Sequence, residues 1–391
     1  MNAREKFLSV MRFEPNNETL VWEFGYWPET LRRWYEEGLP CKTGLPGLNG
    51  VDWVSGEAQP WPLSEKDVRD VDVHDYFEVD EGMQRISINE WIFPPFKEKT
   101  VEENNIYKIV IDEWGIKKKI QKNVTSMPQF LDWPVKNQED FELIKERLNP
   151  RDKRRFPKDW IRLVKKHKKR NFPLGIGGYP VGFFGSLRFL IGTNLYYMYY
   201  DNPELIKMIV GFLTEFWINL WIQVLDKIEV DFVIFFEDIA YKGSPLISPD
   251  LFRKYMMPYY KKITEFLRGE SVDIILVDTD GDFSKLIPLF LESGITGFYP
   301  FEVQAGMDVL KVRKNFPELQ IIGGLDKTKI ALGKVEIDKE LDAKIPFMLE
   351  KGGYIPCADH DLPPNISWEN FVYYRGKLNR MIEKFKMRGS R

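Results

Sequence analysis

The chain has 391 residues, of which 43% are hydrophobic and 29% charged, and its formal net charge at pH 7 is −3. This balance is typical of a globular protein with a large core and excludes the strongly basic character of most nucleic-acid-binding proteins. The N-terminus has no apolar segment, and apolar stretches elsewhere are interrupted well before about 18 residues, so we expect neither a signal peptide nor a membrane span. A soluble cytoplasmic protein is the resulting prediction.

Short apolar runs predicted to be strands alternate with helical patterns along most of the chain. Strands that are apolar throughout favour a parallel sheet covered on both faces. A doubly wound open sheet is the rival, but its usual glycine-rich turn is matched only by GIGGYP (175–180), which has Pro180 at the third glycine position. We predict a single (β/α)8 TIM barrel over residues 1–391, although the eighth strand is not evident. The predicted strands are Leu20–Tyr26, Pro173–Gly178, Phe232–Phe236, Asp273–Val277, Ile295–Tyr299, Leu319–Ile322 and Gly353–Pro356.

Residues 45–130 interrupt the alternation directly after the first predicted strand. Within them, NIYKIVIDEWGIKKKIQK (105–122) is typical of a β-hairpin with its turn near Glu113-Trp114-Gly115. We interpret this region as an excursion from the barrel that serves as a lid, rather than as a separate domain. A basic run at 151–170, with eleven Lys or Arg, is interpreted as a solvated helix face rather than as a docking site.

Acidic residues gather where the predicted strands end, which in a barrel is where catalytic groups lie. A single acid there is readily explained as a helix cap or turn residue, but five such strand ends are more than turns require. Carboxylates at one place raise each other's pKa unless a cation lies among them, so a metal ion, a cationic substrate or a shared proton is implied. The residues at these ends are Glu23, Tyr26 and Trp27; Glu237 and Asp238; Asp278 and Asp280; Asp326 and Lys327; and Asp359, His360 and Asp361.

His360 is the histidine of this group, and imidazole both binds metals and transfers protons near neutral pH. Asp278 and Asp280 are two residues apart on one strand, so their side chains leave the same face. These three residues are predicted to hold a divalent ion such as Zn²⁺, or else to handle a proton. His74 and His167 lie in charged stretches and are expected to be solvated.

Four segments carry a likeness to a known family: EDIAYKGSPLISPDLF (237–252), LVDTDGDFSKLIPLFLESGITGFYPFE (276–302), GGLDKTKIALGK (323–334) and GGYIPCADHDLPPNISWENF (352–371). They resemble the uroporphyrinogen decarboxylase superfamily, which also contains cobalamin-dependent methyltransferases. The resemblance implies a (β/α)8 barrel with its site at the C-terminal mouth. In the thiol-methylating branch a His-x-Cys and a later Cys bind zinc; here Asp278 and Asp280 stand at the first two places and His360 at the third.

The choice of chemistry follows from the charges. A tetrapyrrole decarboxylase needs arginines for the substrate's carboxylates, and GYWPETLRRW (25–34) does not reproduce the family's arginine-rich motif. An acidic mouth also opposes an anionic substrate. Methyl transfer instead needs a proton donor or Lewis acid for the leaving group.

We therefore predict an enzyme that moves a methyl group from a small O- or N-methylated compound, aromatic or not, to a corrinoid carried by a partner protein. The decarboxylase and a non-catalytic ligand-binding barrel stay open as alternatives, and a homodimer is the expected assembly. Catalytic roles are assigned to Glu237, Asp278, Asp280 and His360, and substrate contacts to Glu23, Tyr26, Trp27, Phe184, Asp238 and Lys327.

Overall fold

The computed structural model describes the chain except for residues 16, 41–70, 123–126 and 390–391. Much of the predicted excursion, residues 45–70, therefore lies outside the described residues.

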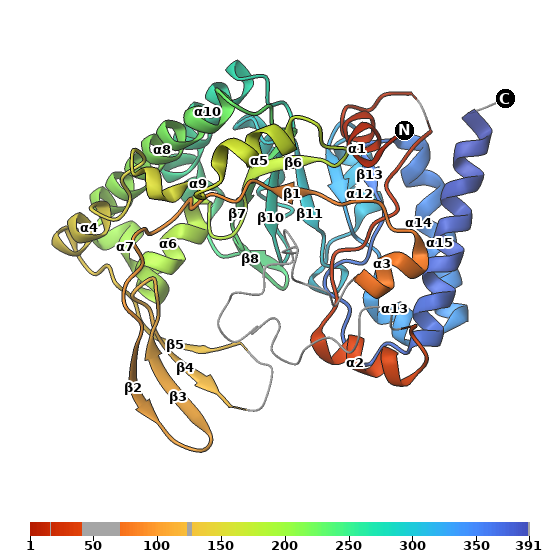
Figure 1. The fold of residues 1–391 in the computed structure, drawn as a ribbon, viewed down its shortest axis with the longest axis horizontal. Coiled ribbons are helices and arrows are strands. Elements are labelled where there is room, and N and C mark those ends of the chain that lie inside the picture. The colour runs from red at the N-terminus through yellow and green to blue at the C-terminus, as the bar shows by residue number, and fades with distance from the viewer. Residues whose placement is uncertain (16, 41–70, 123–126, 390–391) are drawn as a thin grey trace.

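A curled parallel sheet of seven strands, a half-barrel, forms the centre of this mixed α/β fold (Figure 1). Its order is β1-β6-β7-β10-β11-β12-β13, and every neighbouring pair runs parallel. The coarse prediction of a barrel-like α/β fold is thus confirmed, whereas closure by eight strands stays a prediction. The strands are β1 (Gln84–Arg85), β6 (Leu174–Gly177), β7 (Phe232–Phe236), β10 (Ile275–Thr279), β11 (Gly297–Pro300), β12 (Gln320–Ile322) and β13 (Tyr354–Ile355).

Six of the seven predicted strands lie in this sheet, with ends shifted by at most two residues. The other, Leu20–Tyr26, is not a regular strand; Tyr26 alone pairs, in an isolated parallel bridge with Leu362. The polar groups of this segment bond to distant parts of the chain instead: the Val21 carbonyl accepts the Asp80 N–H, and the Glu23 carboxylate accepts the Ala358 N–H. The sheet's remaining strand, β1, is too short to give a periodic signal.

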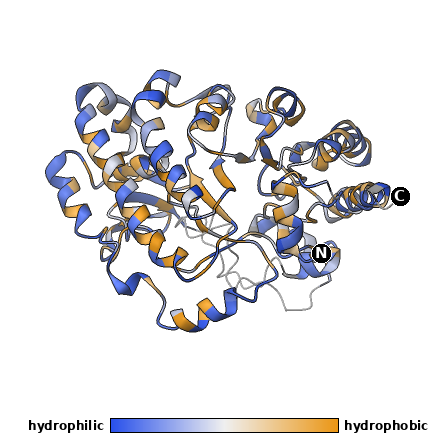
Figure 2. Ribbon diagram, turned by 90° about the horizontal axis from the view of Figure 1, so that it is seen from above, coloured by the Kyte–Doolittle hydropathy of each residue, from blue (hydrophilic) through white to orange (hydrophobic). Residues whose placement is uncertain are grey.

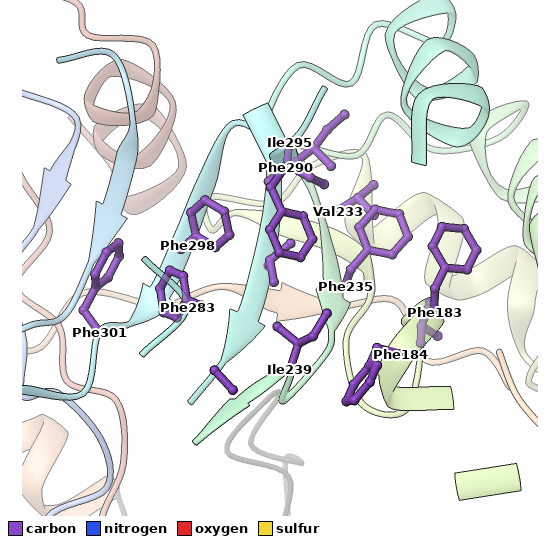
Figure 3. Packing of buried hydrophobic residues seen from close by; sticks show 14 of the residues in the cluster. Phe183, Phe184, Val233, Phe235, Ile239, Phe283, Phe290, Ile295, Phe298 and Phe301 are labelled. Carbon is purple, nitrogen blue, oxygen red and sulfur yellow. The ribbon is translucent and has the colours of Figure 1, made fainter. Parts of the chain in front are cut away.

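The two faces of the sheet pack against different partners. Phe232, Ile234 and Leu276 belong to a buried cluster with the N-terminal helix and the segment around Trp22; we call their side of the sheet the inner face. Val233, Phe235, Val277 and Phe298 pack against the surrounding helices on the outer face (Figure 3). This alternation follows from the strand period of two, and both faces are apolar because both are covered.

A second, antiparallel sheet stands to one side of the half-barrel (Figure 1). It contains β2 (Lys99–Glu103), β3 (Tyr107–Ile111), β4 (Lys117–Gln121) and β5 (Gln129–Asp132), and β8 (Ala240–Tyr241) pairs with β9 (Ser244–Pro245) elsewhere. The chain turns between β3 and β4 at Gly115, where φ is +83° and glycine is the residue best suited to that conformation. The hairpin and its turn fall where the sequence predicts them.

The helices are amphipathic, with hydrophobic residues toward the sheet and hydrophilic ones outside (Figure 2). By length and composition alone, α8 would be long enough to cross a membrane, but 50% of that window is buried within the fold, as in a core helix. The helices are α1 (Ala3–Met11), α2 (Pro28–Glu36), α3 (Val71–Phe77), α4 (Gln138–Lys145), α5 (Trp160–His167), α6 (Phe183–Ile191), α7 (Leu195–Asp201), α8 (Pro203–Leu225), α9 (Pro249–Tyr255), α10 (Met257–Gly269), α11 (Ile287–Glu292), α12 (Val309–Asn315), α13 (Lys327–Ala331), α14 (Lys334–Lys351) and α15 (Trp368–Gly389), with short 3-10 turns at Lys153–Arg155, Gly192–Asn194 and Val303–Ala305.

Candidate active site

Strand register assembles a row of side chains at the carboxyl end of the inner face. Asp278 on β10 is the register partner of Phe236 on β7 and of Tyr299 on β11. Phe236 lies two residues beyond the inner-face Ile234, and Asp278 two beyond Leu276, so all three side chains share that face. Asp280 follows on the same side, as the spacing predicts. The inner face is therefore apolar along the strands and becomes polar at its end.

His360 lies between two carboxylates. Its Nε2 is 3.5 Å from Asp280 Oδ2, its Nδ1 is 3.6 Å from Asp361 Oδ2, and its ring centroid is 5.1 Å from that of Phe24. Burial lowers the pKa of His360, but the negative charges of Asp280 and Asp361 outweigh burial and raise the pKa to about 10. The Asp361 N–H donates to Nδ1 (2.7 Å) and favours the neutral ring. In either state Nε2 carries a proton and faces Asp280.

The neighbouring carboxylates repel one another. Burial and the charges of Asp238 and Asp280 raise the pKa of Asp278 well above its usual value, although a hydrogen bond with Tyr299 opposes this. Burial and Asp280 likewise raise the pKa of Asp238 to about 6. Arg188 lies 3.4 Å from Asp238 Oδ2 and offsets part of this charge. We call Asp238, Asp278, Asp280 and His360 the acidic cluster.

Lys327 borders the acidic cluster, and its ammonium group pairs with two other acids. Its Nζ is 3.5 Å from Asp359 Oδ1 and 3.9 Å from Glu302 Oε1. Asp359 is fully buried and accepts the backbone N–H groups of Val303 and Lys327, so it joins the loops that follow β11 and β12. Lys327 thus contributes positive charge near His360 and Asp280 rather than a free side chain.

The structure separates Glu237 from the acidic cluster. Its carboxylate accepts the N–H groups of Phe183, Phe184 and Gly185 in the first turn of α6, and the hydroxyl of Tyr260 on α10. Burial raises the pKa of Glu237 to about 7, and these hydrogen bonds oppose the rise. The residue follows the inner-face Phe236 and so points to the outer face, where it holds two helices.

Glu23 and Tyr26 are structural as well. Glu23 accepts the N–H of Ala358 (2.7 Å) and lies 3.5 Å from Arg375, which ties the N-terminal segment to the loop after β13 and to α15. The Tyr26 ring is buried against Trp34 and Phe371.

The two other predicted aromatic contacts are Trp27 and Phe184. Trp27 is the N-cap residue of α2 and is half-buried. Phe184 is fully buried in the packing between α6 and the sheet, beside Phe183 (Figure 3).

The two remaining histidines differ from expectation. His167 is buried, and its ring meets Phe172 edge-to-face with the centroids 6.2 Å apart, so the prediction that it is solvated was wrong. His74 is half-buried, and its burial lowers its pKa to about 4.

Asp278, Asp280 and His360 do not present the ligand set expected of a metal site. His360 and Asp280 face each other as an ion pair, and Asp278 bonds to Tyr299. Across the described part of the chain, no three or more His, Cys, Asp or Glu side chains are grouped so as to hold a metal ion. The divalent ion stays a prediction, and no chemical step is derived through it.

Four residues near the acidic cluster were missed by the sequence analysis. Tyr299 and Glu302 lie at or just after the end of β11, so the search for polar residues where strands end could have identified them. Arg85 belongs to a strand of two residues and bonds to the carbonyls of Gly177 and Tyr179, and Arg188 comes from a helix. Neither arginine has a sequence signal, because its role depends on tertiary placement.

Comparison with known proteins agrees with this architecture. Over its full length the chain resembles a solved methyltransferase from Methanosarcina mazei, with a TM-score of 0.58, 13% identity, and coverage of 98% of this chain and 99% of that one. At this identity the likeness concerns the fold.

Two weaker structural similarities carry no argument. One is to an L-ribulose 3-epimerase (TM-score 0.35, 11% identity, 66% of this chain and 94% of that one). The other is to a sugar phosphate isomerase/epimerase from Parabacteroides distasonis ATCC 8503 (TM-score 0.29, 14% identity, 58% and 89%). A search of curated proteins gives no match.

The sequence profile of uroporphyrinogen decarboxylase (URO-D) matches residues 108–374. That range includes β6 to β13 and every member of the acidic cluster. On this match, which covers more than half of its length, the chain belongs to the uroporphyrinogen decarboxylase family.

Proposed function

We propose that this protein is a methyltransferase that moves a methyl group from a small O- or N-methylated compound to the corrinoid of a separate protein. The observation that carries the proposal is His360, a proton-bearing imidazole held between Asp280 and Asp361 at the carboxyl end of the inner face. A general acid in such a place suits a leaving group that departs with an electron pair.

His360, Asp280 and Asp361 would together protonate the leaving group. In its charged form the His360 ring lies between the carboxylates of Asp280 and Asp361, and its Nε2–H faces Asp280 and the space beside it. When the bond between methyl carbon and oxygen breaks, the electron pair stays on oxygen, and the proton on Nε2 neutralises it. Asp280 and Asp361 stabilise the ring while it is protonated. The partner's reduced corrinoid would supply the nucleophile that takes the methyl group.

The charges around His360 make the decarboxylase the weaker candidate. A tetrapyrrole with several carboxylates would meet Asp238, Asp278 and Asp280, and like charges in a confined site cost several kcal/mol. Arg188 is paired with Asp238, and Arg85 is bonded to two backbone carbonyls. Both arginines are therefore occupied by the protein itself.

Methyl transfer to free cob(I)alamin tests the proposal. Wild type is incubated with methoxybenzene or a methylamine, and the loss of Co(I) absorbance is followed. We expect His360→Gln to lower the rate by about 10²–10⁴-fold, the usual contribution of a general acid. Lys334→Gln is the control, because Lys334 is exposed and paired with Glu369 at the surface.

Two outcomes would replace the proposal. Decarboxylation of a uroporphyrinogen without any methyl transfer would establish the decarboxylase. Ligand binding that His360→Gln weakens, with no turnover of either kind, would indicate a non-catalytic barrel.

A further inference from the structure

Four aromatic side chains from four segments meet beside the acidic cluster. Trp114 of the β3–β4 turn lies 5.3 Å from Tyr179 and 5.2 Å from Phe189, measured between ring centroids. Tyr179 and Phe189 in turn lie 4.9 Å and 6.1 Å from Phe236 at the end of β7. We call these four residues the aromatic surface. All four residues are half-buried, unlike the core aromatic residues.

The aromatic surface adjoins the reacting groups. Phe236 is the register partner of Asp278 and projects from the same inner face. Arg188, next to Phe189, holds Asp238, and the charge of Asp238 also acts on the Tyr179 hydroxyl. On the other side of Asp278, Tyr299 packs against Phe24, which packs against His360. The aromatic surface and His360 thus flank the same pair of acids, because Phe236 is level with Asp278 and His360 pairs with Asp280 two residues further on.

Half-buried rings at this place differ from the aromatic residues of the core. Phe183 and Phe184 fill the space between helix and sheet and are fully buried, so they have no face left for a ligand. The aromatic surface keeps apolar area exposed next to charged groups, which is costly unless something covers it. Flat rings gain most from such a surface because they can stack on it or meet its edges.

The proton on His360 discriminates between the two kinds of methylated ligand. A quaternary ammonium loses its methyl group as a neutral amine, which keeps its electron pair and needs no proton. An ether oxygen leaves with a negative charge, and a proton from Nε2 neutralises it. Among flat ligands, the group that uses both the aromatic surface and His360 is a methoxy group on an aromatic ring.

We propose that the substrate is an aryl methyl ether whose ring lies on the aromatic surface while its methoxy oxygen faces His360. The inference rests on the proposed function for the reaction, but its binding part stands on the aromatic surface alone. In the reaction the methyl–oxygen bond breaks, the methyl group goes to the acceptor, and the oxygen leaves as a phenol.

Binding of methoxybenzene, measured by isothermal titration or ligand-observed NMR, tests the inference without requiring turnover. We expect Trp114→Leu and Phe189→Leu each to weaken binding about threefold to tenfold, as expected for loss of an aromatic pair. Trp114→Phe keeps a ring and should retain most of the affinity. Tyr197→Leu is the matched control, because Tyr197 is 70% exposed on α7 and contacts none of these rings in the structure.

The outcomes separate the two proposals. Methoxybenzene binding that both Leu variants weaken, without methyl transfer, would uphold the binding site and overturn the reaction. Methyl transfer from methoxybenzene that neither variant alters, in KM or in binding, would uphold the reaction and overturn the aromatic surface as its site. Tighter binding of tetramethylammonium than of methoxybenzene would also overturn the inference.

Discussion

The ends of β7 and β10 lie side by side and both carry acids, yet the two sets do opposite things. Glu237 points to the outer face, where four donors fill its oxygens and fix two helices. Asp278 and Asp280 point to the inner face, where they meet other acids and a histidine. Glu237, whose oxygens all have hydrogen-bond donors, stabilises the fold. Asp278 and Asp280, which repel one another, are available for proton transfer or ligand binding.

The difference comes from a single residue of register. Asp278 is level with Phe236, so Glu237 lies one step further along its own strand and on the other face. The same contrast between a structural and a functional side chain recurs after β13. Asp359 accepts two backbone N–H groups, whereas His360 pairs with Asp280. Position in the strand period, more than residue type, distinguishes a structural acid from a functional one.

The largest difference in stability is expected between variants that remove the carboxylate of Glu237 and the carboxylate of Asp278. Glu237→Ala leaves three N–H groups and a hydroxyl without their acceptor, and we expect the free energy of unfolding to fall by about 3–5 kcal/mol. Asp278→Asn removes one of several repelling charges, so stability should stay within about 1 kcal/mol or rise. Urea denaturation of both variants measures the contrast. Equal losses in the two would mean that Asp278 is as structural as Glu237.

The pH dependence of stability tests the pairing of His360 with Asp280. The folded pKa of about 10 lies above the ordinary value of 6.5, so protonation of His360 favours the folded state. This stabilisation is complete below pH 6.5 and is lost as the pH rises from there through about 10. Asp280→Asn removes the main charge that raises the pKa, and its stability should change less over that range. Urea titrations at pH 6 and pH 9.5 compare the two proteins.

A smaller effect is expected at Gly25, which makes room for the Asp361 carboxylate. A methyl group there would lie 1.9 Å from Asp361 Oδ1, so Gly25→Ala must displace the buried carboxylate that faces His360. We expect a loss of about 1–3 kcal/mol in stability together with reduced activity. Gly269→Ala is the control, since a methyl group at Gly269 meets nothing within 4 Å. No difference between the variants would mean that the loop moves freely.

Much of this arrangement was predictable from the sequence. Apolar runs located six strands of the sheet, and the strand-end rule identified Asp238, Asp278, Asp280, His360 and Lys327 near one another. The positions of the strand ends could not distinguish Glu237 from Asp278. The face that such a residue occupies depends on the register of strand pairing, and the predicted strand bounds differ from the observed ones by up to two residues.

Other misses have tertiary causes. The segment around Glu23 has the composition of a strand but bonds to a loop and to α15 instead. The aromatic surface joins a hairpin turn, a helix and two strand ends that no local pattern connects.

The link between Glu23 and Ala358 joins residues 335 positions apart. During synthesis, the segment that holds Trp22 and Phe24 is made well over 300 residues before the helix that binds Glu23, since Glu23 and Ala358 are 335 positions apart. Until then these apolar side chains lack their final partners, and pairing over so long a separation is slow. The packing around Trp22 and Glu23 can therefore be completed only after Arg375 has been made, and a nascent chain that stops before Arg375 would expose apolar surface suited to chaperone capture.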